Sequence, residues 1–288
     1  MWNRFAGRLP RFGPLASFRA GDAYPAGDGG QITNTELPRG WIDGLILSNN
    51  GTDADHDIDI AAGEARDGSD AANMALSSAL TKQIDASWAV GTNQGGLDGT
   101  ESVAGTPDAD TWYHVWLIRR SDTGVVDVLF SESATAPTMP TNYDQKRRIG
   151  AVLTDASANI IQFTQFGDRF VWHETPQDHA GASPTTDTNL TLTVPTGIEA
   201  LADVYYDGND SGAIQSFAIL YRTTGPAIVP SATLYNASTQ SSGGGNQHGA
   251  SKLNILADTS GQIRWRATAA AVVSIQTLGW IDPRGRNA

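Results

Sequence analysis

Residues 111–130 read TWYHVWLIRR SDTGVVDVLF, and this stretch decides the fold class. Residues 111–118 are rich in aromatic and β-branched side chains, which favour strands, and residues 125–130 form a second apolar run. Residues 121–124 between them have the small, polar and glycine residues of a tight turn. The stretch therefore predicts a β-hairpin.

The first strand of this hairpin is expected to be buried on both sides. Side chains alternate along a strand, so Trp112, His114 and Trp116 share one face, while Tyr113 and Val115 share the other. Large side chains occupy both faces, as in a strand that lies inside a protein.

Other apolar runs predict more strands outward from this hairpin. Residues 160–166 and 169–172 flank Gly167 and Asp168, which suggests a second hairpin. Residues 71–80 and 142–148 are the segments with helical tendency. Because short strands recur with turn residues between them, we predict an all-β fold with two β-sandwich or jelly-roll-like domains. The remaining predicted strands are residues 56–62, 190–194, 198–206, 213–221, 253–256, 263–267 and 272–278.

The composition excludes several classes of protein. The chain has 288 residues with no cysteine, so it has neither disulfides nor thiolate metal sites. It carries 19 basic and 31 acidic residues, a net charge of −12, which disfavours nucleic-acid binding. No run of about 18 apolar residues occurs, so membrane insertion is not expected. Hydrophobic residues make up 40% of the chain, which favours a folded protein over a disordered one.

Charge and composition divide the chain into an arm, a body domain, a linker and a distal domain. Residues 1–40 have net charge +2, residues 41–173 have −11 and residues 174–288 have −3. Residues 174–188 contain two prolines and a glycine among small polar residues, as linkers do. We therefore expect an extended arm at 1–40, a β-rich body at 41–173, a linker at 174–188 and a distal sandwich at 189–288.

The arm combines cationic and aromatic residues. It has no apolar core like that of a signal peptide, which predicts synthesis in the cytoplasm without a leader. Its large side chains suit pockets on a partner, and its arginines suit partner carboxylates. A disordered terminus is the alternative. The predicted anchoring residues are Trp2, Arg4, Phe5, Arg8, Arg11, Phe12 and Phe18.

Catalytic signatures are absent from the sequence. It has no nucleophile-elbow, zinc-protease, phosphate-loop or dinucleotide motif, so we expect a protein that is not an enzyme. The 31 acidic residues offer many possible carboxylate pairs, and a glycan depolymerase therefore stays as an alternative.

The most metal-like stretch is residues 53–64, with acids at the spacing of a calcium loop. Ile58 stands where such a loop requires glycine, and this favours a strand instead. We expect no cofactor and no metal. Asp53 and Asp55, in the preceding turn, are weak candidates for Ca²⁺.

Aromatic and polar residues near predicted strand ends are candidates for glycan contact. The polar loop 241–249 lacks the lysine of a phosphate loop, so it is either a mobile tip or a recognition loop. The candidate glycan-binding residues are Tyr205, Tyr206, Asn246, Gln247, His248 and Trp265.

Four segments in residues 40–175 resemble β-rich structural proteins of tailed bacteriophages, prophages and gene-transfer-agent-like particles. They are residues 44–63, 111–125, 146–150 and 167–170. The resemblance implies a tail, fibre or spike protein and brings no catalytic residue with it. It also explains how a chain without a leader leaves the cell, since phage particles are released by lysis.

We therefore expect a virion protein that is a fibre or spike component. Its arm would bind other virion proteins of the head, neck or tail, and its distal domain would bind a bacterial surface glycan. Virion symmetry favours a cyclic homo-oligomer, most often a trimer in fibres. The alternatives are a purely architectural head-decoration, neck or baseplate protein without a receptor, and a glycan depolymerase.

Overall fold

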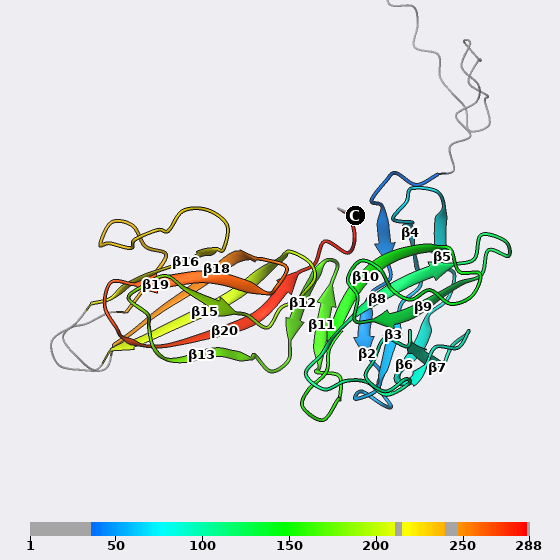
Figure 1. Ribbon diagram of the computed structural model, residues 1–288, viewed down its shortest axis with the longest axis horizontal. Helices are drawn as coiled ribbons and strands as arrows, with labels where there is room; N and C mark the ends of the chain where they lie inside the picture. The colour runs from blue at the N-terminus through cyan, green and yellow to red at the C-terminus, as the bar shows by residue number, and fades with distance from the viewer. Residues whose placement is uncertain (1–35, 211–214, 240–246, 287–288) are drawn as a thin grey trace, which may run out of the picture. The chain divides into compact units, whose positions relative to one another are not determined.

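A computed structural model describes residues 36–210, 215–239 and 247–286 of the chain (Figure 1). These residues form 20 strands and no helix, and the all-β fold class is confirmed. None of them belongs to a helix with the length and apolarity needed to cross a membrane. The described residues from Glu36 onward belong to one compact unit.

Most strands belong to one 13-stranded sheet, in the order β10-β8-β9-β7-β6-β3-β2-β11-β12-β20-β15-β18, with β13 also on β20. Neighbours pair in antiparallel fashion except β6–β7 and β7–β9, which are parallel. The strands are β2 (Leu47–Asn49), β3 (Asp57–Ile60), β6 (Leu80–Ser87), β7 (Gln94–Leu97), β8 (Trp112–Arg119), β9 (Val126–Ser131), β10 (Gln145–Leu153), β11 (Phe163–Phe166), β12 (Arg169–Trp172), β13 (Gln177–Ala182), β15 (Ala200–Asp210), β18 (Gln247–Ala257) and β20 (Val272–Ile281).

Two smaller sheets complete the fold. One has the order β1-β4-β5, and the other β14-β19-β16-β17. Side chains of the second small sheet and of β15, β18 and β20 share one buried cluster, which gives this region the character of a β-sandwich. Jelly-roll connectivity stays a prediction. The strands are β1 (Ile42–Gly44), β4 (Gly63–Arg66), β5 (Asn73–Leu76), β14 (Thr188–Thr191), β16 (Phe217–Arg222), β17 (Ala237–Ser238) and β19 (Gln262–Ala267).

The hairpin that decides the fold class forms as predicted. β8 and β9 pair from His114↔Ser131 to Arg119↔Val126, on either side of the expected turn. The six central residues of β8 are buried. Tyr113 and Val115 point into the main core, whereas Trp116 belongs to a separate cluster on the other face. The large side chains on the two faces of β8 therefore belong to two different hydrophobic clusters.

The second predicted hairpin is also present and connects the two halves of the chain. β11 pairs with β12, and β12 pairs with β20. Phe170 on β12 stacks on Trp280 of β20 with ring centres 4.8 Å apart, and Trp172 lies 4.9 Å from the same indole. These large aromatic contacts stabilise the junction beyond the backbone hydrogen bonds.

Three sequence expectations are corrected. Residues 71–80 contain strand β5, and residues 142–148 lead into strand β10, so the helical tendency of both segments is overridden by sheet pairing. The expected linker, residues 174–188, contains β13, which pairs with β20 from Gln177↔Gln276 to Ala182↔Val272. Part of that segment is therefore a member of the large sheet.

Candidate functional site

Three consecutive cations on β10 define the candidate site: Lys146, Arg147 and Arg148. β10 is the end strand of the large sheet and pairs with β8. In that register Arg148 lies opposite Trp116 and Lys146 lies opposite Ile118. Lys146 Nζ is 5.5 Å from the centre of the Trp116 ring, which is a cation–π distance.

A pocket of about 580 Å³ opens beside these cations. Its volume is within the range of small-molecule sites, about 300–1,000 Å³. Trp116 and Ile198 give it apolar surface, and the hydroxyl residues Ser69, Thr135 and Thr259 lie on its wall. The charged side chains that line it are Asp67, Asp144, Lys146, Arg147, Arg148 and Glu199.

Two glycines keep the wall of the pocket open. Gly285 has φ +66°, and a Cβ there would lie 3.2 Å from Arg147 Nε. Gly197 has φ +79°, and a Cβ there would lie 2.5 Å from the Cβ of Ala134. Any other residue at these positions is strained and crowds the pocket wall.

Arg148 is fully neutralised by its neighbours. Its Nη1 and Nη2 donate to the two carboxylate oxygens of Asp282 at 2.6 and 2.8 Å, and its Nε donates to His114 Nδ1 at 2.8 Å. Burial, with the charge of Arg148, lowers the pKa of His114 to about 3. His114 is therefore neutral at pH 7 and can accept this hydrogen bond.

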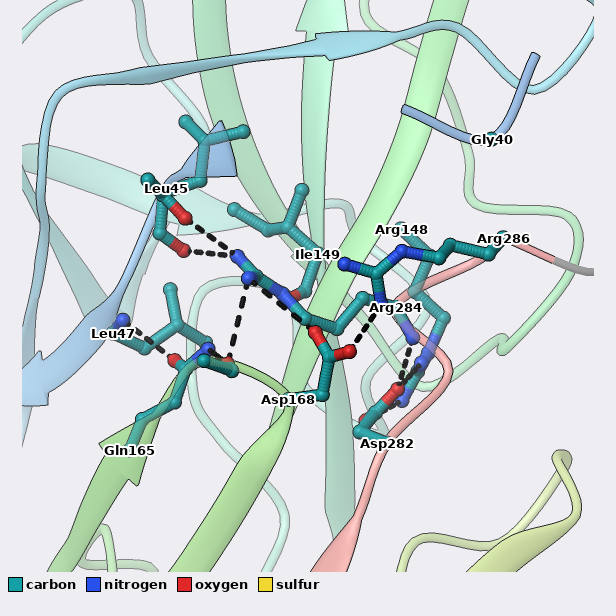
Figure 2. Close-up of polar contacts among 12 residues, drawn as sticks. Gly40, Leu45, Leu47, Arg148, Ile149, Gln165, Asp168, Asp282, Arg284 and Arg286 are labelled. Carbon is teal, nitrogen blue, oxygen red and sulfur yellow. Dashed lines mark hydrogen bonds and ion pairs between the residues drawn. The ribbon is translucent and has the colours of Figure 1, made fainter. Parts of the chain in front are cut away.

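Arg284 ties backbone segments together (Figure 2). Its Nη2 donates to the carbonyl oxygens of Gly44 (3.0 Å) and Leu45 (2.5 Å), and its Nε donates to that of Ile149 (2.8 Å). Burial lowers the pKa of Arg284 to about 10. Asp168 lies 3.9 Å from Arg284 Nη1. This side chain is a structural link between β10, the turn between β11 and β12, and the end of β1.

Arg147 differs from these arginines because no carboxylate in the described part of the chain forms an ion pair with it. Only 2% of its surface is exposed. Its Nε and Nη2 donate to the carbonyl oxygens of Arg284 (2.9 Å) and Gly40 (3.2 Å). Burial, and then the charges of Arg286 and Arg284, lower its pKa to about 10, so it stays charged at pH 7.

The carboxylates of the pocket already have hydrogen-bond donors. Asp67 accepts from the backbone N–H groups of Ala71 (2.6 Å) and Ala72 (2.8 Å), and from Ser69. Burial alone would raise its pKa, but these hydrogen bonds outweigh burial and hold the pKa below the usual value. Asp144, hydrogen-bonded to the side chain and backbone of Ser121, also has a lowered pKa.

This arrangement suits binding better than acid catalysis. A general acid for glycoside cleavage needs a raised pKa, whereas the pKa of Asp67 and of Asp144 is lowered. Across the described residues, no group of three or more His, Cys, Asp or Glu side chains is arranged to hold a metal ion. The pocket offers a cation, an indole surface and hydroxyl groups.

The residues predicted to bind glycan are not gathered at one accessible surface. Tyr206 is fully buried and Trp265 is 2% exposed, packed edge-on against His179. Buried side chains cannot reach a glycan, so these two assignments are wrong. Tyr205 is half-buried on β15. Asn246 and the side chains of Gln247 and His248 lie outside the described residues.

The weak calcium candidates are elements of a turn. Asp53 Oδ1 accepts from the backbone N–H of His56 at 3.1 Å and lies 3.2 Å from His56 Nδ1. The backbone oxygen of Asp55 accepts from the N–H of Ile160 at 2.7 Å. The strand expected at residues 56–62 is present as β3, with Ile58 and Ile60 buried.

The predicted anchoring residues, Trp2, Arg4, Phe5, Arg8, Arg11, Phe12 and Phe18, all lie outside the described residues. No sequence prediction includes the pocket. The sequence signal for it is the run of three cations at 146–148, in a chain with only 19 basic residues. The site is hard to predict because its walls come from segments as far apart in the sequence as residues 67 and 285.

Neither the protein-family models nor the curated proteins contain a match to this chain.

Proposed function

We propose that this chain is a structural component of a phage-like particle, a fibre or spike, and that its pocket binds a bacterial surface glycan. The observation that carries the binding part is the pocket of about 580 Å³ with Trp116, hydroxyl residues and a charged guanidinium on its walls. Aromatic surface beside polar and charged hydrogen-bonding groups is what sugar rings require of a binding site.

The particle part of the proposal is supported by the resemblance of residues 40–175 and by the all-β architecture. Attachment to other virion proteins is assigned to residues 1–40, whose charge is opposite to that of residues 41–173. A cyclic homo-oligomer would multiply weak glycan binding at each copy through effective concentration.

The particle part is tested by deleting residues 2–20 and purifying the particles. We expect the shortened protein to fold with an unchanged thermal midpoint and to be missing from the particles, as measured by immunoblot. Particles that still carry it at the normal level would rule out attachment through the arm. Absence of the full-length protein from particles would rule out the virion role.

The glycan part is tested by binding of the full-length protein to an array of bacterial polysaccharides. Thr135 is exposed at the pocket rim, so Thr135→Trp fills the pocket without changing the core. We expect this variant to lose the binding of the parent protein. Polysaccharide binding that survives Thr135→Trp would place the glycan site elsewhere, and no binding at all would favour the architectural alternative.

A depolymerase is the second candidate, and one carboxyl pair bears on it. The pKa of Asp108 is lowered, chiefly by hydrogen bonds from Ser102, and that of Glu132 is raised, chiefly by burial, and such opposite shifts are typical of paired catalytic carboxyls. A polysaccharide chain-length assay separates this candidate, because only an enzyme shortens the polymer.

A further inference from the structure

We propose that the ligand of the pocket is an anionic sugar and that Arg147 binds its carboxylate or phosphate group. This inference rests on the proposed glycan binding and adds the chemical class of the ligand. The inference starts from which charged groups around the pocket form ion pairs and which do not.

The other arginines near the pocket form ion pairs with acids, although two of them share one carboxylate. Arg148 has both oxygens of Asp282. Arg284 and Arg286 both lie within ion-pair distance of Asp168. Arg147 is as buried as Arg148 and Arg284, yet its acceptors are two carbonyl oxygens, which carry no net charge. A buried cation that forms no ion pair is costly, so an anion that enters the pocket and bonds to it is stabilised there.

Donor geometry leaves Arg147 able to bind such an anion. A guanidinium has five N–H donors in one plane. Nε and Nη2 each donate to a backbone oxygen, while Nη1 donates to no acceptor among the described residues. The residue lines the pocket, and Gly285, which also lines it, places no side chain against the guanidinium. Carboxylate and phosphate oxygens are the acceptors that match this planar fork.

The acidic residues of the pocket form no hydrogen bond or ion pair with Arg147, although the charge of Asp67 acts on it from a longer distance. Asp67 and Asp144 are held by serine and backbone donors, and Glu199 lies 3.7 Å from Arg222. Lys146 adds a second cation, placed over the Trp116 ring. When the anionic group of a ligand binds Arg147, the rest of that ligand lies next to the indole of Trp116 and the hydroxyl groups of the pocket wall. Such surroundings suit a sugar ring better than a bare ion.

The test measures binding of four probes to the full chain by ligand-observed NMR: glucuronic acid, glucose 6-phosphate, glucose and inorganic phosphate. We expect at least one of the two anionic sugars to bind about tenfold more tightly than glucose, the effect of a charge-assisted contact of about 1.4 kcal/mol. Which of the two binds more tightly identifies the source as a uronate or a sugar phosphate.

Other outcomes separate the two proposals. Equal binding of glucose and the anionic sugars overturns this inference and leaves the glycan function standing. Inorganic phosphate binding as tightly as the anionic sugars means an adventitious ion only and overturns the inference. If no sugar binds here while the polysaccharide array gives Thr135→Trp-sensitive binding, the inference alone fails.

Three variants assign the effect to residues. Arg147→Gln should remove the preference for the anionic sugar, and Arg264→Gln, a surface arginine outside the pocket, should keep it. Because Arg147 also holds two backbone segments, its variant is interpreted only if its thermal midpoint shows a folded protein. Lys146→Gln, at a half-buried position, should weaken the binding of the anionic sugar and leave the binding of glucose unchanged. The proposal is overturned if Arg147→Gln and Lys146→Gln both keep the parent's preference for anionic sugars over glucose. If Arg147→Gln does not fold, an unchanged preference in Lys146→Gln is enough to overturn it.

Discussion

Arg148 and Asp282 are 134 residues apart in the sequence and form a two-pronged ion pair whose side chains are 3% and 0% exposed. The pair joins β10 to the segment that follows β20. Charges buried to this degree have lost their hydration, so each partner depends on the other. The folded state therefore requires both halves of the described chain to be in place.

Asp282→Ala should destabilise the protein by about 3–5 kcal/mol, the usual loss when one partner of a buried pair is removed. The variant leaves Arg148 uncompensated and also removes the acceptor of the Arg284 backbone N–H, which is 2.7 Å from Asp282 Oδ1. Urea unfolding measures the change. Asp122→Ala, which breaks the exposed pair with Arg120, is the matched control and should have a much smaller effect. Equal losses in the two variants would contradict the role of burial.

His114 should make stability depend on pH. Its pKa is 6.5 when unfolded and about 3 when folded, so between these values the unfolded chain binds more protons. Stability therefore falls as pH is lowered from 6.5 towards 3, by at most about 1.4 kcal/mol per pH unit. Despite burial, the pKa of Asp282 is lowered from its usual 3.8 by Arg148, so its contribution is lost progressively as the pH falls below about 3.8.

The variant His114→Gln isolates this effect, because glutamine can accept from Arg148 and does not titrate. We expect a flatter profile of unfolding free energy between pH 6 and about 4 than in the parent protein. A variant profile that parallels the parent would show that another group is responsible.

The buried pair of Lys82 and Asp127 predicts an order of severity. Lys82 Nζ lies 3.0 Å from Asp127 Oδ1, and burial lowers the pKa of this lysine despite the opposing charge. Asp127 also accepts from the backbone N–H groups of Gly91 (2.8 Å) and Val128 (2.7 Å). Asp127→Ala should therefore cost more stability than Lys82→Met, because it leaves a cation and two amide donors without partners. Urea unfolding of both variants checks the order, and the reverse order would contradict it.

Gly63 lies where two strands approach too closely for a side chain. A Cβ at this position would be 2.4 Å from both the carbonyl oxygen of Asp43 and the backbone nitrogen of Leu45. Backbone atoms cannot rotate away, so Gly63→Ala should lower stability by about 1–3 kcal/mol or more. Gly51→Ala is the control, since nothing lies within 4 Å of that Cβ. Similar thermal midpoints for the two variants would contradict this reading of the β1–β4 contact.

Local patterns in the sequence predicted the two hairpins and several further strands, but not β1, β2, β4 to β7, β10, β13 or β17. The two hairpins form as expected because their signals, apolar runs on both sides of a turn, lie within about 20 residues of sequence. The segment 71–80 has helical propensity but contains strand β5, because pairing with β4 outweighs that propensity. The strand of residues 177–182 was hidden in a composition typical of linkers, and its pairing with β20 reaches about 100 residues along the chain.

The candidate site was harder to predict because it depends on contacts between distant residues. Tyr206 and Trp265 were expected at a surface on the basis of their neighbours in sequence, yet alternation along β15 and β19 turns both inward. Arg147 and Arg148 are adjacent and chemically identical, and only the fold separates them: one faces Asp282 and the other does not. No sequence pattern distinguishes a neutralised arginine from an unpaired one.

The position of β20 in the large sheet has a consequence for how the protein is made. β20 pairs with β15 on one edge and with β12 and β13 on the other, and all three precede it in the chain. While residues 272–281 are still inside the ribosome, β12, β13 and β15 have unpaired edges that are open to other chains. This part of the sheet therefore completes its folding only after residues 272–281 have left the ribosome. Before that point, pairing with neighbouring chains competes with correct folding.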